Sequence, residues 1–272
     1  MDTALQFMTA LARDAGALLV DYFRRDGLQT SLKADRSVVT EADLAADQFI
    51  TQAIQKQFPQ DRLLSEEINP SLPAALSSAD DSILWIVDPL DGTTNFSLGL
   101  HTWGTLLTRC IGGWPEATVL YFPLLDELYT ARRSQGALLN DKPIRVYSPT
   151  PERPLAFFAC CSRTHRQYQV SLPYKVRILG SAAYSFCLVA RGAAIIGFEA
   201  TPKIWDIAGP WLLIKEAGGI IETYDGSQPF PLITGVTYEQ TSYPTLAAPS
   251  DSLITKARRQ IQLNPTQPSD RT

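Results

Sequence analysis

Apolar and polar residues near the start of the chain follow the spacing of amphipathic helices. Between Leu5 and Tyr22 the apolar side chains recur every three or four residues, which predicts a first helix. A second helix is predicted from Glu41 to Gln57. Because Thr40 and Asp43 fit a capping box at its start, Asp43 is interpreted from the local pattern as a capping residue.

Short apolar and β-branched runs, separated by turn residues, dominate the middle of the chain. The later runs follow one another with only tight turns between them, which predicts an antiparallel sheet. The predicted strands are residues 63–67, 83–87, 103–111, 117–122, 127–131, 137–139 and 144–146.

Beyond residue 154 the pattern changes to alternating strands and helices, which is typical of an α/β half. Strands are predicted at 155–161, 175–179, 194–198 and 220–223, and helices at 162–168, 182–191 and 207–217. The proline-rich stretch from Ser148 to Pro154 is the predicted boundary. Residues 1–147 would then form an N-terminal half and residues 155–265 a C-terminal half of one functional unit, with the site between them.

Composition narrows the function classes. The net charge is −4 and no long basic run occurs, which argues against nucleic acid as the main partner. The chain has no long apolar stretch and no basic-then-apolar leader, so we expect a soluble cytoplasmic protein without a membrane segment. The four cysteines are interpreted as free, mostly buried thiols. With only His101 and His165, any chemistry must depend on carboxylates.

The stretch from Trp85 to Phe96 is the strongest candidate for chemistry. Asp88 and Asp91 follow an apolar run, and Pro89 restricts the backbone at Asp88. Gly92 lets the backbone approach a ligand closely, and hydroxyls and amides follow it. Two carboxylates at the end of a strand suit Mg²⁺, which binds few carboxylates together with waters and phosphate oxygens. An ordinary turn remains the alternative interpretation.

Two further acids fit the same site. Glu66 ends a predicted strand, although neighbouring glutamates are usually solvated. Asp206 precedes a predicted helix, where its simplest role is the N-cap, and Pro210 is placed in the first turn. If these acids met Asp88 and Asp91 without cations, they would repel and raise one another's pKa values. Their clustering would therefore require bound Mg²⁺.

Several segments resemble sequence motifs of the inositol monophosphatase family and occur in the same order along the chain. The run from Asp88 to Phe96, Asp-Pro-Leu-Asp-Gly-Thr-Thr-Asn-Phe, is similar to its first signature, and Trp205 to Gly219 is similar to its second. Ser65-Glu66-Glu67 resembles the family's Gly-Glu-Glu segment, with serine at the glycine position, and the run 39–43 resembles its Val-Thr-x-x-Asp segment. The matches span residues 38 to about 223 and are more specific for the superfamily than for a substrate.

This resemblance implies a layered α/β/α/β/α sandwich, an α/β (α+β) fold of the sugar phosphatase type, and a homodimer. It also implies a lithium-sensitive, Mg²⁺-dependent phosphomonoesterase with two to three Mg²⁺ per site. The implied reaction is hydrolysis of myo-inositol monophosphate by a metal-activated water, without a phosphoenzyme.

The resemblance also assigns roles by position. The implied metal ligands are Glu66, Asp88, the Leu90 carbonyl, Asp91 and Asp206. The implied catalytic residues are Asp43 and Thr93, which orient the attacking water, and Glu66, which helps to hold a third metal. The implied surroundings of the substrate are Glu66, Leu90, Asp91, Gly92, Thr93, Gly180, Ser181, Ala182, Glu199 and Asp206, with Ser162 on the same wall.

Three questions stay open at the level of sequence. The same chemistry could act on fructose 1,6-bisphosphate, histidinol phosphate, a sugar 1-phosphate or adenosine 3′,5′-bisphosphate. The basic run from Arg163 to Arg166 could be a second anion contact or a solvated helix face. The chain could also be a regulatory binding protein on the same fold, since some bacterial relatives bind the transcription machinery.

Overall fold

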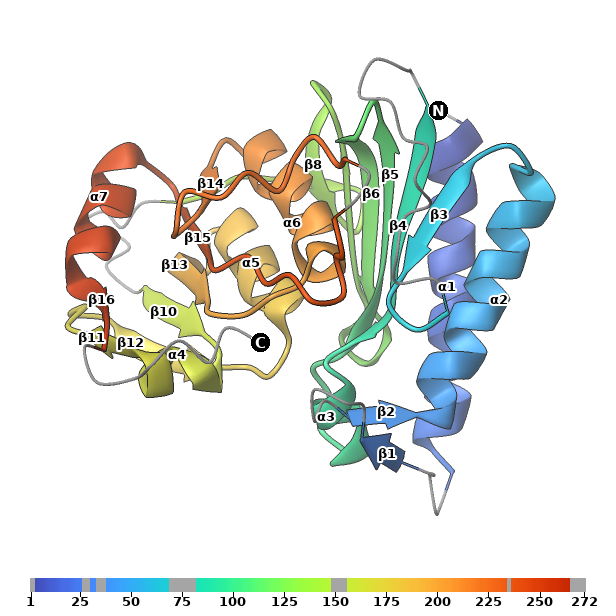
Figure 1. Ribbon diagram of the computed structural model, residues 1–272, viewed down its shortest axis with the longest axis horizontal. Coiled ribbons are helices and arrows are strands. Elements are labelled where there is room, and N and C mark those ends of the chain that lie inside the picture. The colour runs from blue at the N-terminus through green and yellow to red at the C-terminus, as the bar shows by residue number, and fades with distance from the viewer. Residues whose placement is uncertain are drawn as a thin grey trace.

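Helices and sheets alternate in layers in the computed structural model, which describes residues 3–25, 30–32, 38–68, 82–147, 156–233 and 236–264. Helices α1 (Thr3–Phe23) and α2 (Glu41–Gln57) cover one face of a large sheet. Helices α5 (Ala182–Ala190) and α6 (Ile204–Glu216) lie between this sheet and a smaller one, and α7 (Asp251–Gln260) lies outermost (Figure 1). The predicted layered sandwich is thus confirmed. The predicted boundary at 148–154 lies outside the described residues.

The large sheet has the order β3-β4-β5-β6-β7-β8-β9. Strands β3 and β4 are parallel, and every later neighbour is antiparallel. The tight turns predicted this arrangement for the strands from β5 onward. Its strands are β3 (Arg62–Ser65), β4 (Ile83–Asp91), β5 (Gly104–Ile111), β6 (Trp114–Phe122), β7 (Glu127–Arg132), β8 (Gly136–Leu139) and β9 (Lys142–Ile144). The short helices α3 (Thr93–Ser97) and η1 (Pro123–Leu125) follow β4 and β6.

The smaller sheet has the order β12-β10-β13-β15-β14 and mixes parallel and antiparallel pairs. Its strands are β12 (Lys175–Ile178), β10 (Phe157–Cys160), β13 (Ala194–Glu199), β15 (Thr245–Ala248) and β14 (Ile220–Thr223). Helix α4 (Ser162–Gln167) follows β10, and two short pairs, β1 (Thr30–Leu32) with β2 (Val38–Thr40) and β11 (Tyr168–Val170) with β16 (Ile261–Leu263), complete the fold. The sequence pattern predicted neither these pairs nor β15 and α7.

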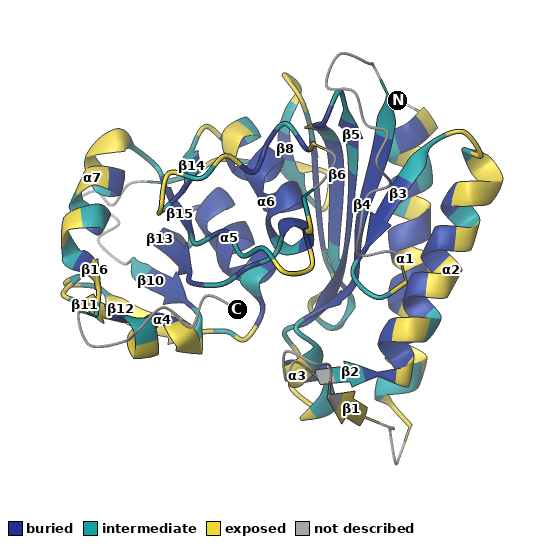
Figure 2. Ribbon diagram, in the orientation of Figure 1, coloured by how far each residue is buried: buried dark blue, intermediate teal, exposed yellow. Residues whose placement is uncertain are grey.

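Strand β4 is buried along almost its whole length (Figure 2). Its side chains alternate between two cores. Leu84 and Ile86 pack in the core that contains α5 and α6. Trp85 and Val87 pack in the core that contains α1 and α2. By the same alternation Asp88 falls on the face that meets α6, which determines where its carboxylate lies.

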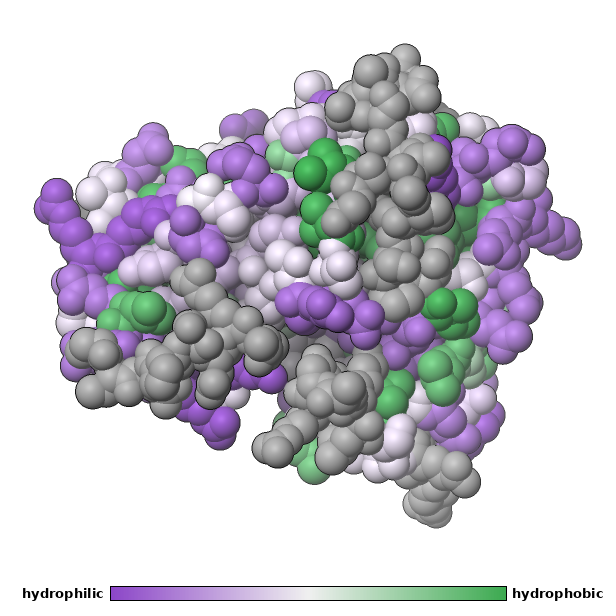
Figure 3. All heavy atoms as spheres, in the orientation of Figure 1, coloured by the Kyte–Doolittle hydropathy of each residue, from purple (hydrophilic) through white to green (hydrophobic). Residues whose placement is uncertain are grey.

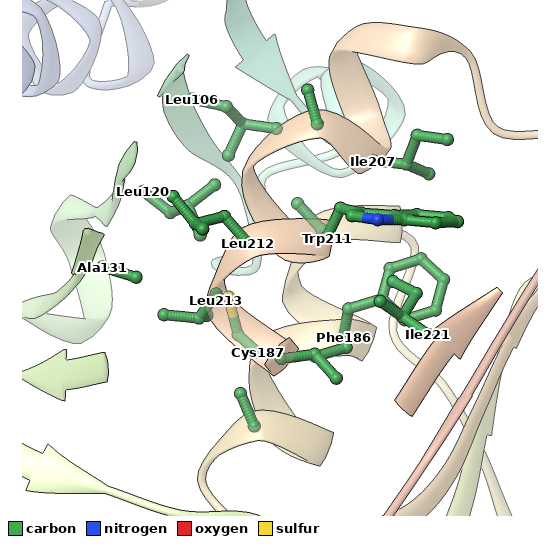
Figure 4. Packing of buried hydrophobic residues seen from close by; sticks show 14 of the residues in the cluster. Leu106, Leu120, Ala131, Phe186, Cys187, Ile207, Trp211, Leu212, Leu213 and Ile221 are labelled. Atoms are coloured by element: carbon green, nitrogen blue, oxygen red, sulfur yellow. The ribbon is translucent and has the colours of Figure 1, made fainter. Parts of the chain in front are cut away.

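Helix α6 is the packing link between the two sheets. Figure 4 shows Leu212 and Leu213 of α6 beside Leu120 and Ala131 of the large sheet, and Phe186 of α5 also packs in this core. Gly209 allows α6 to approach the sheet closely, because a Cβ there would lie 2.7 Å from Thr118 Oγ1 and 2.8 Å from Leu120 Cδ2.

Two features of this region differ from the sequence prediction. Helix α6 begins at Ile204, so Asp206 lies inside the first turn and the N-cap is Lys203. Pro210 therefore lies in the helix interior and not in the first turn. Ile204 and Trp205 are buried, and this packing extends the helix beyond what the local signals indicated. Strand β4 likewise continues through Pro89 to Asp91 instead of ending at Val87.

The outer helices present a polar surface. On the face seen in Figure 3, hydrophilic side chains gather over α7 and over α1 and α2, and hydrophobic ones form separate small patches. Among the described helices, none combines the length and the apolar character that a membrane crossing requires.

Replacing Gly209 by alanine should destabilise the fold. The added methyl group would overlap Thr118 and Leu120, and overpacking of this kind costs about 1–3 kcal/mol. Urea unfolding measures the change in the free energy of unfolding. Gln52→Ala, on the exposed face of α2, is the control and should stay within about 0.5 kcal/mol of wild type. Equal stability of the two variants would contradict the close approach of α6 to the sheet.

Candidate active site

Three acids from different elements converge at one end of the large sheet. Ser65 pairs with Val87 in the parallel β3–β4 ladder, and the Glu66 amide donates to the Val87 carbonyl at 3.1 Å. Glu66 therefore leaves the sheet beside Asp88, since parallel strands end at the same edge. Asp206 joins them from the first turn of α6, and each acid offers a carboxylate oxygen within 4.8 Å of the others.

The electrostatics of this cluster suit a bound cation. Oδ1 of Asp88 accepts from the Leu90 amide at 3.1 Å, but the buried Oδ2 has no hydrogen-bond partner among the described residues. Burial, together with the charges of Glu66, Asp91 and Asp206, raises the pKa of Asp88 well above its usual range. Burial and the Asp91 charge raise the pKa of Asp206 to about 8. A divalent cation would satisfy the orphaned oxygen and offset the repulsion, so the donor set fits a hard metal ion.

Asp91 faces the C-terminal half of the chain. Its Oδ2 accepts from the Ser181 hydroxyl, and its Oδ1 accepts from the Ala182 amide at 3.2 Å. Burial raises the pKa of Asp91 to about 7, although these hydrogen bonds lower it, and the Glu66 charge adds to the rise. The structure thus joins Asp91 to two of the residues predicted to surround the substrate.

The N-terminus of α2 brings Asp43 into contact with Thr93, the first residue of α3, and these two form the predicted catalytic pair. Oδ2 of Asp43 accepts from the Thr40 amide at 2.8 Å and Thr40 Oγ1 accepts from the Asp43 amide at 3.4 Å, which forms the predicted capping box. The Thr40 hydroxyl also donates to Asp43 Oδ2 at 2.5 Å. Oδ1 of Asp43 lies 2.9 Å from Thr93 Oγ1, which also lies 3.0 Å from the Leu90 carbonyl. Burial raises the pKa of Asp43 to about 6. Asp43 therefore caps the helix and also contacts the site.

The corner after β4 presents backbone amides beside the acids. Gly92 is the N-cap of α3 with φ +87°, and a Cβ there would lie 2.9 Å from the Thr102 carbonyl, so only glycine fits. Gly92 and Thr93 are partly exposed and Thr94 is exposed. The start of α3 can therefore receive an anionic group.

The smaller sheet delivers Glu199 to the same region. Glu199 ends β13, is 4% exposed, and has a pKa raised to about 8 by burial, with further contributions from the Asp91 and Asp206 charges. Ser162 begins α4 and is exposed. In the basic run of α4, Arg163 Nη1 donates to Thr201 Oγ1 at 2.7 Å, and His165 Nε2 lies 3.8 Å from Cys160 Sγ.

Two residues that support the site were not singled out from the sequence. Asp47, one turn after Asp43 on α2, accepts the amides of Glu67 and Ile68 at 3.0 Å each and so fixes the segment that follows Glu66. Burial raises the pKa of Asp47, and the Ile68 and Glu67 amides act against this rise together with the hydroxyl of Ser65, which stands at the glycine position of the resemblance. Asn95, four residues after Asp91, bonds to both halves of the chain. The sequence signal that could have identified them is their spacing, since Asp47 follows Asp43 by four residues and Asn95 follows Asp91 by four residues.

Comparisons with known proteins agree with this geometry. A family model described as the inositol monophosphatase family matches residues 1–263. A Nus factor SuhB of Pasteurella multocida is 34% identical over 244 residues, which cover 85% of this chain and 88% of that protein. A histidinol-phosphatase of Chlorobaculum parvum is 33% identical over 240 residues, with 84% and 88% covered. An inositol monophosphatase structure from Anabaena matches with a TM-score of 0.70 and 27% identity over 97% of each chain.

In the absence of divalent cations, the free energy of unfolding should decrease as pH rises. The pKa values of about 7 for Asp91 and about 8 for Asp206 and Glu199 lie above the ordinary 3.8 of aspartate and 4.5 of glutamate. Between these values the folded chain binds more protons than the unfolded chain, so the free energy of unfolding decreases with pH. The metal-free melting temperature should be lower at about pH 8 than at about pH 5.

Thermal unfolding in EDTA and in excess Mg²⁺ measures this effect. Mg²⁺ should raise the melting temperature more at the higher pH, because metal binding competes with protons for the same carboxylates. A metal-free melting temperature that increased with pH across this window would contradict the electrostatic description of the cluster.

Proposed function

Because the chain belongs to the inositol monophosphatase family, we propose that it is a Mg²⁺-dependent phosphomonoesterase that hydrolyses myo-inositol monophosphate to inositol and phosphate. The observation that carries this proposal is the convergence of Glu66, Asp88 and Asp206, with a buried oxygen of Asp88 left unpartnered among the described residues. Such a cluster is unfavourable alone and suited to metal-assisted phosphoryl transfer.

The proposed metal ligands are Glu66, Asp88, the Leu90 carbonyl, Asp91 and Asp206. When bound, Mg²⁺ supplies Lewis-acid activation of water and neutralises charge on the phosphate and the leaving oxygen. The burial of Asp88 and Asp91 keeps bulk water away from the ligands and so strengthens every charge interaction at the site.

Thr93 and Asp43 would accept the proton of the attacking water. Thr93 Oγ1 can donate to Asp43 Oδ1 at 2.9 Å, which leaves its lone pairs free to accept a hydrogen bond from water. Asp43 Oδ1 can then take up the proton that passes through the Thr93 hydroxyl. Because burial raises the pKa of Asp43 to about 6, it is a better proton acceptor near neutral pH than an ordinary aspartate.

The substrate would bridge the two halves. The amides of Gly92 and Thr93 would hold the phosphate, and the segment 180–182 with Glu199 would contact the cyclitol hydroxyls. Burial raises the pKa of Glu199 to about 8, so near neutral pH its carboxyl group can donate as well as accept hydrogen bonds. Ser162 at the start of α4 would line the same wall.

Two other candidates have specific support. The similarity to a histidinol-phosphatase favours the same chemistry on histidinol phosphate. The similarity to a Nus factor SuhB favours a regulatory role in binding the transcription machinery, carried by a surface and not by the acids. Binding of purified transcription complexes that persisted in an inactive variant of the site would support the regulatory role. The resemblance also leads us to expect a homodimer, which sedimentation would test.

Asp88→Asn should abolish turnover without unfolding the protein. The carboxamide oxygen introduced by this substitution can still accept from the Leu90 amide, while the neutral group removes charge from the cluster. We expect kcat/KM for phosphate release to fall by at least about 10³-fold, consistent with the loss of electrostatic stabilisation in the transition state. The metal-free melting temperature should not fall, since repulsion decreases.

Asp21→Asn, on the exposed face of α1, is the matched control for the loss of one carboxylate. It should retain wild-type kinetics. Wild-type turnover in Asp88→Asn would exclude Asp88 from the mechanism.

Phosphate release from a panel of esters would identify the substrate. The panel comprises myo-inositol monophosphate, histidinol phosphate, fructose 1,6-bisphosphate, a sugar 1-phosphate and adenosine 3′,5′-bisphosphate, compared by kcat/KM. We expect the highest value for inositol monophosphate, loss of activity in EDTA, recovery with Mg²⁺ and inhibition by lithium. Full activity in chelator would refute the metal-dependent mechanism, whereas preference for another ester would change only the substrate.

A further inference from the structure

The side-chain amide of Asn95 joins the two halves of the chain beside the proposed site. Asn95 lies in α3 and is 6% exposed. Its Nδ2 donates to the Thr102 carbonyl at 2.7 Å and to the Leu179 carbonyl at 2.7 Å. Both amide protons are therefore used, one within the N-terminal half and one across to the C-terminal half.

The backbone after Leu179 lies directly on this amide. Gly180 has φ +74°, and a Cβ there would overlap the carboxamide group of Asn95. The next two residues bond to Asp91, through the Ser181 hydroxyl and the Ala182 amide. The run from Leu179 to Ala182 is thus attached to two side chains of one corner, Asp91 and Asn95, which lie four residues apart.

We propose that Asn95 is a positioning residue that sets the register of residues 180–182 against Asp91 and so controls how tightly the leaving group of the substrate is bound. This inference rests on the proposed function, because that function places the hydroxyls of the substrate at residues 180–182. Asn95 donates its two amide protons to backbone carbonyls and to none of the proposed metal ligands.

The two carbonyls each require a hydrogen-bond donor, and the side-chain amide of Asn95 supplies both. A buried carbonyl that loses its donor is left unsatisfied, and an acceptor placed opposite it would repel it. Aspartate has the shape of asparagine but offers only acceptors when ionised. Asn95→Asp therefore separates the donor role from simple space filling, because the packing is kept and the donation is lost.

The test compares kinetics with two leaving groups. Asn95→Asp should raise KM for inositol monophosphate about tenfold or more, as expected for loss of a buried hydrogen bond. KM for p-nitrophenyl phosphate, whose leaving group has no hydroxyls for residues 180–182, should change much less. Asn95→Ala should show the same selective change at smaller size, since it lacks the repulsion. Ser97→Ala is the matched control, because the Ser97 hydroxyl donates to the Thr93 carbonyl of its own helix and does not reach the other half.

Two results would overturn the proposal. Wild-type kinetics in Asn95→Asp with impaired Asn95→Ala would show that Asn95 only fills space. An equal change in KM for both substrates in either variant would show a general defect of the site instead of one in the leaving-group wall.

Hydrogen exchange of the Mg²⁺-free protein gives a readout that needs no catalysis. The amides of Ala182 and Ala183, which both bond to Asp91, should exchange faster in Asn95→Asp than in wild type or Ser97→Ala, while the exchange of α2 amides stays unchanged. If wild type hydrolyses no inositol phosphate, the proposed function fails but this measurement still decides the role of Asn95. Unchanged exchange at these amides in both Asn95 variants would reject that role.

Discussion

The structure depends on holding like charges together in a place that excludes water. Asp88, Asp91 and Glu199 are almost fully buried, and burial with mutual repulsion raises the pKa of each above its ordinary value. Repulsion of this kind would separate the carboxylates if they lay on mobile loops. They are instead attached to β4 and to β13, and Asp206 to the first turn of α6, and the buried faces of these elements hold them in place.

Hydrogen bonds to neutral groups help to hold this cluster of acids in place. Asp43 and Asp47, one turn apart on α2, reach the Thr93 hydroxyl and the amides that follow Glu66. Asn95 performs the corresponding task across the halves. A rigid helix with a capping box is a suitable base for such contacts, because the box satisfies amides at its N-terminus. The acids that face the proposed metal are therefore oriented by groups that need not face it.

Features that depend on residues close together in sequence could be predicted from the sequence pattern, and contacts between distant residues could not. Helices α1 and α2, the capping box and the antiparallel strands depend on neighbours in sequence, and the pattern predicted them correctly. The N-cap role of Asp206 was wrong, because packing extends α6 back to Ile204. Asp47 and Asn95 were missed because their partners lie 20 and 84 residues away and no local pattern encodes such pairs. Proximity of Glu66 to Asp206 was expected from the family resemblance and not from any local pattern, and the fold brings these two acids together.

Strand geometry determines which residues of the site each half of the chain supplies. Alternation along β4 turns Asp88 toward α6, and the parallel β3–β4 ladder brings Glu66 beside it, so the acid cluster is fixed by the large sheet and the helix packed on it. The wall formed by residues 180–182 and Glu199 belongs to the other half and meets the cluster through Asp91 and Asn95. We propose that changes in that wall alter which leaving group fits. Glu66, Asp88 and Asp206 would keep their positions, because β3, β4 and α6 hold them, whereas Asp91 is coupled to the wall through Ser181 and Ala182.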